Sequence, residues 1–143
     1  MSASPEMLES YRRDKVVQDN IVESWVCIDC GVNTAPNVPN GPQTRINLRV
    51  YGKSRVTYDR GCEVYAVKDA IWKKAGVRPW QGALCIGCLE IRLGRQLRPR
   101  DFSRHDRETW ANLPCTDRLL NRRGLTSGPG EIALDVTWED IIE

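Results

Sequence analysis

Two identical pairs of cysteines are the residues of this chain whose type and spacing best support a chemical role. Cys27 and Cys30 form one C-x-x-C pair, and Cys85 and Cys88 form another. Two residues between cysteines let both sulfurs approach one ion from a tight turn, so two such turns complete a tetrahedron of thiolates around zinc. Four protein ligands leave no open position for water or substrate. The pattern therefore predicts one structural Zn²⁺ ion and no catalytic metal.

The sequence beside each pair supports this geometry. Gly31 follows Cys30, and a residue free to take a positive φ lets the turn curl so that backbone N–H groups face the sulfurs. The second pair precedes three leucines on one stripe, which predict a helix that ends before Pro99. A helix N-terminus favours thiolate through its partial positive charge. We expect a zinc knuckle at the first pair and a helix start at the second, with the stripe formed by Leu89, Leu93 and Leu97.

Two other uses of paired cysteines stay open from the residues alone. A thioredoxin-like redox pair normally follows a strand in a longer βαβ unit, and a second identical pair would be redundant. An iron–sulfur cluster also takes four thiolates, although this two-by-two spacing is commoner for zinc. Cys62 and Cys115 have no partner at ligand spacing, so we expect them to be small buried apolar groups. The single histidine, His105, lies in a polar stretch and is expected on the surface.

Hydrophobic periodicity predicts short strands and helices around the cysteines. Ile46, Leu48 and Val50 alternate with other residues, a pattern typical of a half-buried strand, and residues 56–58 are expected to pair with it as a β-hairpin. Knuckle, hairpin and helix follow one another as in a treble-clef zinc finger. The predicted fold class is α+β, a small treble-clef-like zinc-binding domain with a β-hairpin and short helices. We also expect strands over 21–26, 64–67 and 132–136, a loop over 33–42, and helices over 69–75 and 116–123.

Length and composition favour one domain with flanking segments. The chain has 143 residues, of which 41% are hydrophobic and 28% charged, enough to bury a core. We expect 1–20 to form an N-terminal arm or helix, 21–123 the zinc-binding domain, and 124–143 an acidic C-terminal segment. No apolar run approaches the roughly 20 residues of a membrane span, and no signal peptide is apparent. The expected location is cytoplasmic, where thiols stay reduced and six cysteines favour metal binding over disulfides.

A net charge of +2 conceals opposite blocks along the chain. Residues 92–123 carry 9 basic and 4 acidic side chains, whereas 124–143 carry no basic and 5 acidic ones. Guanidinium groups are planar donors suited to phosphate recognition, although they could equally form a solvated face that pairs with the chain's own acidic ends. We expect a nucleic-acid-binding face that contains Arg92, Arg95, Arg98, Arg100 and Arg104.

Four short segments of this chain resemble one family. The segments from Cys27 to Gly31 and from Leu84 to Glu90, together with Arg92-Leu93-Gly94-Arg95 and Asp101-Phe102, resemble a group of small uncharacterised bacterial and bacteriophage proteins. The resemblance covers roughly residues 27–102 and is most specific in the second motif. It implies a zinc-binding fold and a prokaryotic or viral setting, and it implies no particular activity.

The residues of known enzyme classes do not occur in the required patterns. The treble clef is also the scaffold of HNH-type nucleases, which need a histidine general base and further His or Asn metal ligands, whereas this chain has only His105. Zinc deaminases need H-x-E with P-C-x-x-C, but Pro114-Cys115 is followed by Arg118 where the second cysteine would stand. There is no G-x-x-x-x-G-K-[ST] loop and no G-x-S-x-G elbow. We expect that the protein is not an enzyme.

The favoured function is association with nucleic acid. The arginine-rich face would contact phosphates beside a zinc-anchored helix. Aromatic side chains could stack on bases where they are exposed, and the candidates are Trp80, Phe102 and Trp110.

The alternative function is a protein-binding adaptor or inhibitor, in which zinc only stabilises the scaffold. The acidic stretch 131–143 is a candidate contact for a basic partner, or a mimic of nucleic acid toward one. Tryptophans near the ends of predicted elements are candidate interface anchors: Trp25, Trp110 and Trp138.

Overall fold

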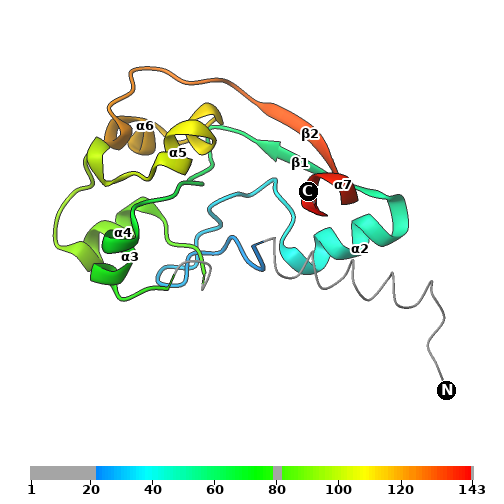
Figure 1. Cartoon of the computed structure of the whole chain (residues 1–143), viewed down its shortest axis with the longest axis horizontal. Helices are drawn as coiled ribbons and strands as arrows, with labels where there is room; N and C mark the ends of the chain where they lie inside the picture. Colours follow the sequence, from blue (N-terminus) through cyan, green and yellow to red (C-terminus); the bar gives the residue numbers. More distant parts are fainter. Residues whose placement is uncertain (1–21, 79–81, 143) are drawn as a thin grey trace.

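The computed structural model describes residues 22–78 and 82–142. Within these ranges, short helices are combined with a two-stranded antiparallel sheet, which confirms the expected α+β class. The predicted N-terminal arm over 1–20 and the candidate stacking residue Trp80 lie outside the described ranges. Figure 1 shows one group of helices gathered at one end of the molecule and a second group beside the sheet at the other end. The first group is α3 (Asp69–Ala75), α4 (Ile86–Leu93), α5 (Arg104–Glu108) and α6 (Asp117–Arg123), and the second is α2 (Gly41–Tyr51) and α7 (Trp138–Ile142).

The sheet joins segments that are far apart in the sequence. β1 (Lys53–Tyr58) pairs antiparallel with β2 (Ile132–Thr137), so that Lys53 lies opposite Thr137 and Tyr58 opposite Ile132. The predicted strand over 132–136 is confirmed. Val136 of β2 also packs against buried residues on β1 and in the loop before α2. The sheet therefore fixes part of the C-terminal segment against the middle of the chain.

The predicted β-hairpin over 46–58 is wrong, because 41–51 form helix α2 instead. Pro42 lies in the first turn, where its missing N–H costs nothing. Gly52 ends the helix with a φ of 73°, and its N–H donates to the Leu48 carbonyl at 3.0 Å. Leu48 is 1% exposed, whereas Ile46 and Val50 are 50% and 64% exposed. That distribution follows a helical period and not the alternation of a strand.

The other predicted helices are present, with one change of length. α3 and α6 match the expected ranges 69–75 and 116–123, but α4 ends at Leu93 and not just before Pro99. Gly94 takes a φ of 73° and its N–H caps the last turn, which stops the helix. Leu97 therefore lies beyond the helix, but its side chain is still buried in the core. Its N–H donates to the Glu90 carboxylate at 2.7 Å, which ties this segment back to α4.

Two predicted strands are reduced to single bridges within the described residues. In the segment 21–26, Val26 bridges to Asn33, and in the segment 64–67, Val67 bridges to Phe102. The loop predicted over 33–42 is irregular up to residue 40, after which α2 begins. Two 3₁₀ turns complete the architecture, η1 (Pro99–Asp101) and η2 (Trp110–Asn112).

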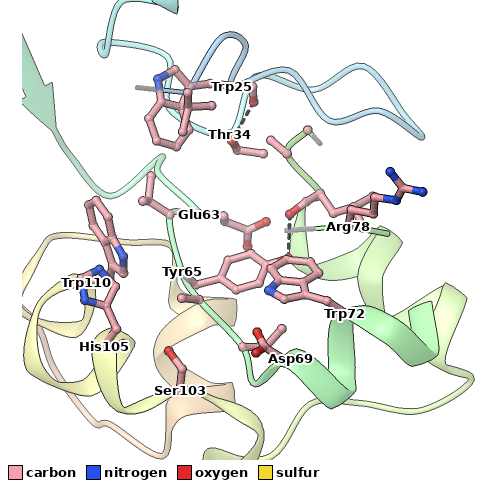
Figure 2. Close-up of a pocket in the computed structure, with 17 residues that line it drawn as sticks. Trp25, Thr34, Glu63, Tyr65, Asp69, Trp72, Arg78, Ser103, His105 and Trp110 are labelled. Carbon is pink, nitrogen blue, oxygen red and sulfur yellow. Dashed lines mark hydrogen bonds between the residues drawn. The ribbon is translucent and has the colours of Figure 1, made fainter. Parts of the chain in front are cut away.

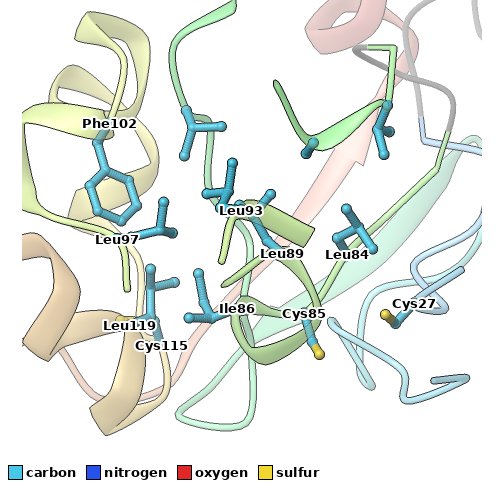
Figure 3. Packing of buried hydrophobic residues seen from close by; sticks show 13 residues of the cluster. Cys27, Leu84, Cys85, Ile86, Leu89, Leu93, Leu97, Phe102, Cys115 and Leu119 are labelled. Atoms are coloured by element: carbon cyan, nitrogen blue, oxygen red, sulfur yellow. The ribbon is translucent and has the colours of Figure 1, made fainter. Parts of the chain in front are cut away.

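Buried hydrophobic side chains in the described part of the chain form two clusters. The smaller core lies beside β1 and contains Ala35, Val38, Val56, Cys62 and Val64. The larger core surrounds α4, and Figure 3 shows the sulfur-bearing residues Cys27 and Cys85 at one edge of it. Its members are Cys27, Val67, Ala75, Val77, Leu84, Cys85, Ile86, Leu89, Leu93, Leu97, Phe102, Cys115 and Leu119. The cysteine turns therefore sit where α4 meets the packed interior.

Candidate metal centre

The first cysteine turn folds back on itself between Cys27 and Val32. The N–H of Cys27 donates to the Val32 carbonyl at 2.7 Å, and the N–H of Gly31 donates to the Cys27 carbonyl at 2.9 Å. Gly31 has a φ of 82°, a left-handed conformation that glycine adopts without strain. This turn buries Cys27 and leaves Cys30 exposed at its tip.

The second cysteine turn begins helix α4. Cys85 is the N-cap residue, and its Sγ accepts a hydrogen bond from the Cys88 N–H at 3.4 Å. The predicted helix start is therefore present at this pair. Burial raises the pKa of the Cys85 thiol and outweighs the Cys88 N–H bond and the positive end of the helix, which both favour the thiolate.

A short backbone contact holds the two turns together. The N–H of Ile28 donates to the Ala83 carbonyl at 2.9 Å, and Cys27 forms a parallel bridge with Ala83. Gly82 makes this approach possible, because a Cβ there would lie 2.6 Å from Cγ2 of Ile28. Backbone contacts thus contribute to bringing the two cysteine pairs together.

The four sulfur atoms meet in one cluster. The Sγ atoms of Cys27, Cys30, Cys85 and Cys88 all lie within 4.8 Å of one another. The Sγ atoms of Cys30 and Cys85, from different pairs, are 3.8 Å apart. Four sulfurs at about 2.3 Å from a central ion would be separated by about 3.8 Å along each edge of their tetrahedron. The cluster could therefore hold one metal ion, and four sulfur donors fit a soft or borderline metal.

The cysteines of the cluster do not ionise equally. Burial opposes ionisation of Cys27, but hydrogen bonds from the backbone of Cys85, Cys30 and Asp29 outweigh burial and lower its pKa to about 6. Burial, followed by hydrogen bonds with the neighbouring sulfurs, raises the pKa of Cys88 well above its usual range. One thiolate therefore forms readily, and additional thiolates are unfavourable until a cation neutralises them.

An ion pair braces the first turn from outside. Asp29, between Cys27 and Cys30, accepts two hydrogen bonds from the Arg92 guanidinium at 2.7 and 2.6 Å, which lower the pKa of its carboxyl. A third N–H of Arg92 donates to the Ala75 carbonyl at 3.1 Å. Arg92 thus ties the first turn to α4 and to the end of α3. Asp29 was not among the predicted site residues. The only sign of its role in the sequence is the position of an acidic residue inside the C-x-x-C pair.

Glu63 braces the second pair from the side of the core. Its Oε1 accepts the Ile86 N–H at 3.0 Å and pairs with Arg118 at 2.7 Å, while its Oε2 accepts from the Thr116 hydroxyl at 2.7 Å. Burial opposes its ionisation, but these partners outweigh burial and lower the pKa of Glu63. The Arg118 guanidinium lies against Gly87, where a Cβ would be 2.8 Å from Nη1. Glu63 is distant from both pairs in the sequence, so no pattern identified it.

Two of the five predicted nucleic-acid-binding arginines form ion pairs with carboxylates of the fold. Arg92 is the partner of Asp29, as described above. Arg95 pairs with Asp101 at 2.7 Å, and a second hydrogen bond joins them at 3.0 Å. Asp101 also accepts the Arg98 N–H at 2.8 Å. The contacts of Asp101 fix η1 against the end of α4. Arg92 and Arg95 therefore both have structural roles, since each joins α4 or the segment after it to another part of the chain.

The other three predicted arginines lie on the surface. Arg104 forms an exposed pair with Glu108 one turn further along α5. Arg98 and Arg100 are exposed on either side of Pro99, and within the described residues neither side chain has an ion-pair partner. The structure therefore divides the predicted arginine-rich face into structural and accessible members.

The remaining candidate residues behave as expected from their surroundings. Cys62 and Cys115 are buried, burial raises the pKa of both thiols, and both lie outside the sulfur cluster. His105 is exposed, and its ring meets the Trp110 ring edge-on with centroids 5.7 Å apart.

Comparison of the chain with protein-family models, with curated proteins and with solved structures finds no match. The resemblance to small bacterial and bacteriophage proteins therefore stays a prediction. Among the described helices, none has the length and apolar character needed to cross a membrane.

Proposed function

We propose that the sulfur cluster holds one structural Zn²⁺ ion between the first cysteine turn and the start of α4, a treble-clef-like pair of ligand elements without the predicted hairpin between them. Support comes from the convergence of both cysteine pairs on one point, with the sulfurs of Cys30 and Cys85 at the separation that a zinc tetrahedron requires. Two independent redox pairs would have no need to meet. Four sulfur ligands also fill the coordination of zinc, so the ion would stabilise the fold and leave no position for a substrate.

Elemental analysis of the protein purified without added metal tests this proposal. We expect one zinc per chain, released by thiol-modifying reagents. Iron bound in place of zinc, with the visible absorbance of an iron–sulfur cluster, would show that the assignment of the metal is wrong.

We propose further that the protein binds nucleic acid through a basic surface formed by Lys68, Arg98, Arg100, Arg104 and Arg107. The observation that carries this proposal is that Arg98 and Arg100 are exposed without ion-pair partners among the described residues, on a segment that internal contacts hold rigid. Rigid presentation lowers the entropy that binding would cost. Arg98, Arg100 and Arg104 thus replace the five-residue face as the predicted phosphate contacts.

Backbone contacts bring the members of this basic surface together. The Lys68 N–H donates to the Asp101 carbonyl at 2.9 Å, and the Ser103 N–H donates to the Ala66 carbonyl at 3.0 Å. Residues 66–68 therefore run beside 101–103. Lys68 lies next to the turn that presents Arg98 and Arg100, and α5 with Arg104 and Arg107 begins directly after it. Clustered cations of this kind attract a phosphate backbone by releasing its counterions.

Binding of a fluorescently labelled single-stranded oligonucleotide, followed by anisotropy across a range of salt concentrations, tests this surface. Replacing Arg98 and Arg100 together by alanine should weaken binding and reduce the log–log salt slope by about 1.4, since each phosphate contact to a single strand contributes about 0.7. The matched control replaces Lys53 and Arg55 on β1 by alanine, which removes the same charge from the other part of the molecule. Equal losses in both double variants, or binding that ignores salt, would contradict the proposal.

A protein-binding function is the second candidate, and one observation favours it. Ile46, Val50 and Tyr51 on α2 are all at least half exposed, the last by 71%. Exposed apolar side chains one helical turn apart are typical of an interface. Capture from nuclease-treated lysate of one stoichiometric protein by the wild type, but not by a Val50→Asp variant, would favour this function over the first.

A further inference from the structure

A pocket of about 390 Å³ opens between the two cores. It shares Glu63, Gly82 and Ala83 with the metal centre, and its other lining residues belong neither to that centre nor to the basic surface. Figure 2 shows aromatic side chains around it, with Trp110 and His105 on one side and Tyr65 and Trp72 on the other. Trp25 closes a further side. A pocket of several hundred Å³ with apolar walls and a few polar groups is the usual form of a small-molecule site.

The aromatic walls are held in fixed positions. Tyr65 and Trp72 are stacked, with ring centroids 5.9 Å apart and planes inclined by 22°. The Tyr65 hydroxyl donates to the Leu84 carbonyl at 2.8 Å, which anchors the pair to the segment leading into α4. On the opposite side His105 and Trp110 support one another edge-on. Fixed, flat aromatic walls favour a planar ligand, because stacking then costs little ordering of the protein.

Three polar side chains in this pocket have hydrogen-bonding capacity to spare. Asp69 and His105 line it, and within the described part of the chain the Asp69 carboxylate has no hydrogen-bond or ion-pair partner and the His105 ring nitrogens have no hydrogen bond. Ser103 also lines the pocket, where its Oγ accepts the Asp106 N–H at 3.1 Å and keeps its own proton to donate. The carboxylate is an acceptor only, so it selects a ligand that presents N–H donors.

Cationic residues flank the pocket-lining residues along the chain. Lys68 precedes Asp69 at the start of α3, Arg104 stands between Ser103 and His105, and all of these side chains except Ser103 are exposed. Arg78 lines the pocket itself. A ligand that places a flat ring against the aromatic walls could therefore place an attached phosphate on these cations.

We propose that this pocket binds one unpaired nucleobase that carries an exocyclic amino group, with the phosphate of its nucleotide on Lys68 or Arg104. The base would stack against the Tyr65–Trp72 pair, and the Asp69 carboxylate would accept the amino protons, as carboxylates accept from the cytosine amino group. The inference deepens the proposed nucleic-acid function, because it assigns a site for an extruded or terminal base beside the basic surface.

Cytidine and uridine monophosphate form the matched pair of probes, because they differ in an amino group and a carbonyl at one ring position. Titrations followed by tryptophan fluorescence and by calorimetry should show cytidine monophosphate binding about tenfold more tightly to the wild type. Asp69→Asn should remove or reverse this preference, since the amide can donate to the uracil carbonyl. Trp72→Ala should weaken both nucleotides, and Tyr51→Ala, on the distant helix α2, should change neither.

Asp69 is exposed, so its replacement by asparagine should not disturb folding, and circular dichroism with zinc content will verify this for each variant. Equal binding of the two nucleotides to the wild type, or a preference that Asp69→Asn leaves unchanged, would overturn the assignment of the pocket.

The two proposals can fail separately. Salt-dependent oligonucleotide binding without any binding of the mononucleotides would contradict the proposed base-binding pocket and still support the proposed basic surface. Mononucleotide binding that survives the Arg98→Ala and Arg100→Ala replacements, in a protein that binds no oligonucleotide, would support the pocket and overturn the proposed nucleic-acid function.

Discussion

Gly82 lies where the two cysteine turns approach each other, and the space beside it has no room for a side chain. A Cβ there would meet Cγ2 of Ile28 at 2.6 Å, beside the hydrogen bond from Ile28 to Ala83. We expect Gly82→Ala to push the turns apart and to cost about 1–3 kcal/mol of stability, the usual range for overpacking. Denaturant unfolding of the zinc-loaded protein measures it.

The control for this substitution is Gly130→Ala, because a Cβ at Gly130 would meet nothing within 4 Å. It should change the free energy of unfolding little. Zinc affinity, measured by competition with a coloured chelator, should fall for the Gly82 variant only. Equal stabilities and affinities for the two variants would show that the close approach has no consequence.

Asp101 illustrates how a single carboxylate makes stability depend on pH. Arg95 is the main cause of the lowered pKa of this carboxyl, so the charged form favours the folded state. The stabilisation is complete above the unfolded pKa of about 3.9 and is lost as the pH falls through the folded pKa. Asp101→Asn should therefore cost about 2 kcal/mol at neutral pH, as for hydrogen bonds to charged groups.

The difference in stability between the wild type and Asp101→Asn should shrink as the pH falls below about 4. Taking this difference removes the effects of the other carboxylates and of metal release, which both proteins share. Glu108→Gln, at an exposed pair on α5, should cost under about 0.5 kcal/mol at any pH. A pH-independent difference at Asp101 would contradict the role given to its charge.

At the scale of single residues, the sequence predicted which cysteines come together better than it predicted what the arginines do. The spacing of a C-x-x-C pair is visible in the local sequence, and a four-sulfur cluster requires only that two such pairs come together in the fold. Spacing alone therefore identified the members of the cluster, which are Cys27, Cys30, Cys85 and Cys88. The partner of an arginine depends on tertiary structure. Arg92 finds its carboxylate on a distant turn, and nothing in the local sequence distinguishes it from the accessible Arg98.

At the scale of elements, the error over residues 46–58 came from an alternation too short to be decisive. Only three apolar residues supported the strand, whereas Pro42 and Gly52 bracket a helix of ordinary length, and both signals were present in the sequence. The correct partner of β1 is β2, far along the chain, and no turn signal could identify that pairing. The predicted helices α3 and α6 are present, and their ends are local, because Gly76 and Gly124 cap their last turns in the left-handed conformation.

Truncation of apolar side chains on α2 distinguishes the helix from the predicted strand. In a strand, Leu48 and Val50 would share one buried face, and both truncations would be costly. In α2, Leu48 is buried and Val50 is 64% exposed. We expect Leu48→Ala to cost about 2–5 kcal/mol and Val50→Ala less than about 0.5 kcal/mol, measured by urea denaturation. Similar losses of unfolding free energy for both variants would contradict the helix and support the predicted strand.

At the scale of the whole molecule, the cysteine turns link the two cores. Cys27 and Cys85 belong to the larger core, while Trp25 and Ala35, on either side of the first turn, pack in the smaller one. The Thr34 N–H donates to the Trp25 carbonyl at 2.8 Å, which closes the chain around the turn. A bound ion would therefore stabilise both cores together, since each is small and depends on the position of the same segment.

Removal of the metal should consequently destabilise the whole fold and not only the cysteine turns. We expect chelation, or Cys30→Ser, to lower the unfolding free energy by at least about 3 kcal/mol, well within the energy of structural zinc binding. Cys30 is exposed, so its replacement disturbs no packing, and the loss can be attributed to the ion. Cys115→Ala is the control: it should keep its zinc and lose only the packing of a buried thiol and the hydrogen bond that its Sγ accepts from Arg123 at 3.6 Å. Amide hydrogen exchange should become faster on chelation in β1 as well as in α4, because residues of the first turn and its flanks pack in both cores. An apo protein with an unchanged melting temperature, or faster exchange confined to the cysteine turns, would show that the two cores are stable without the ion.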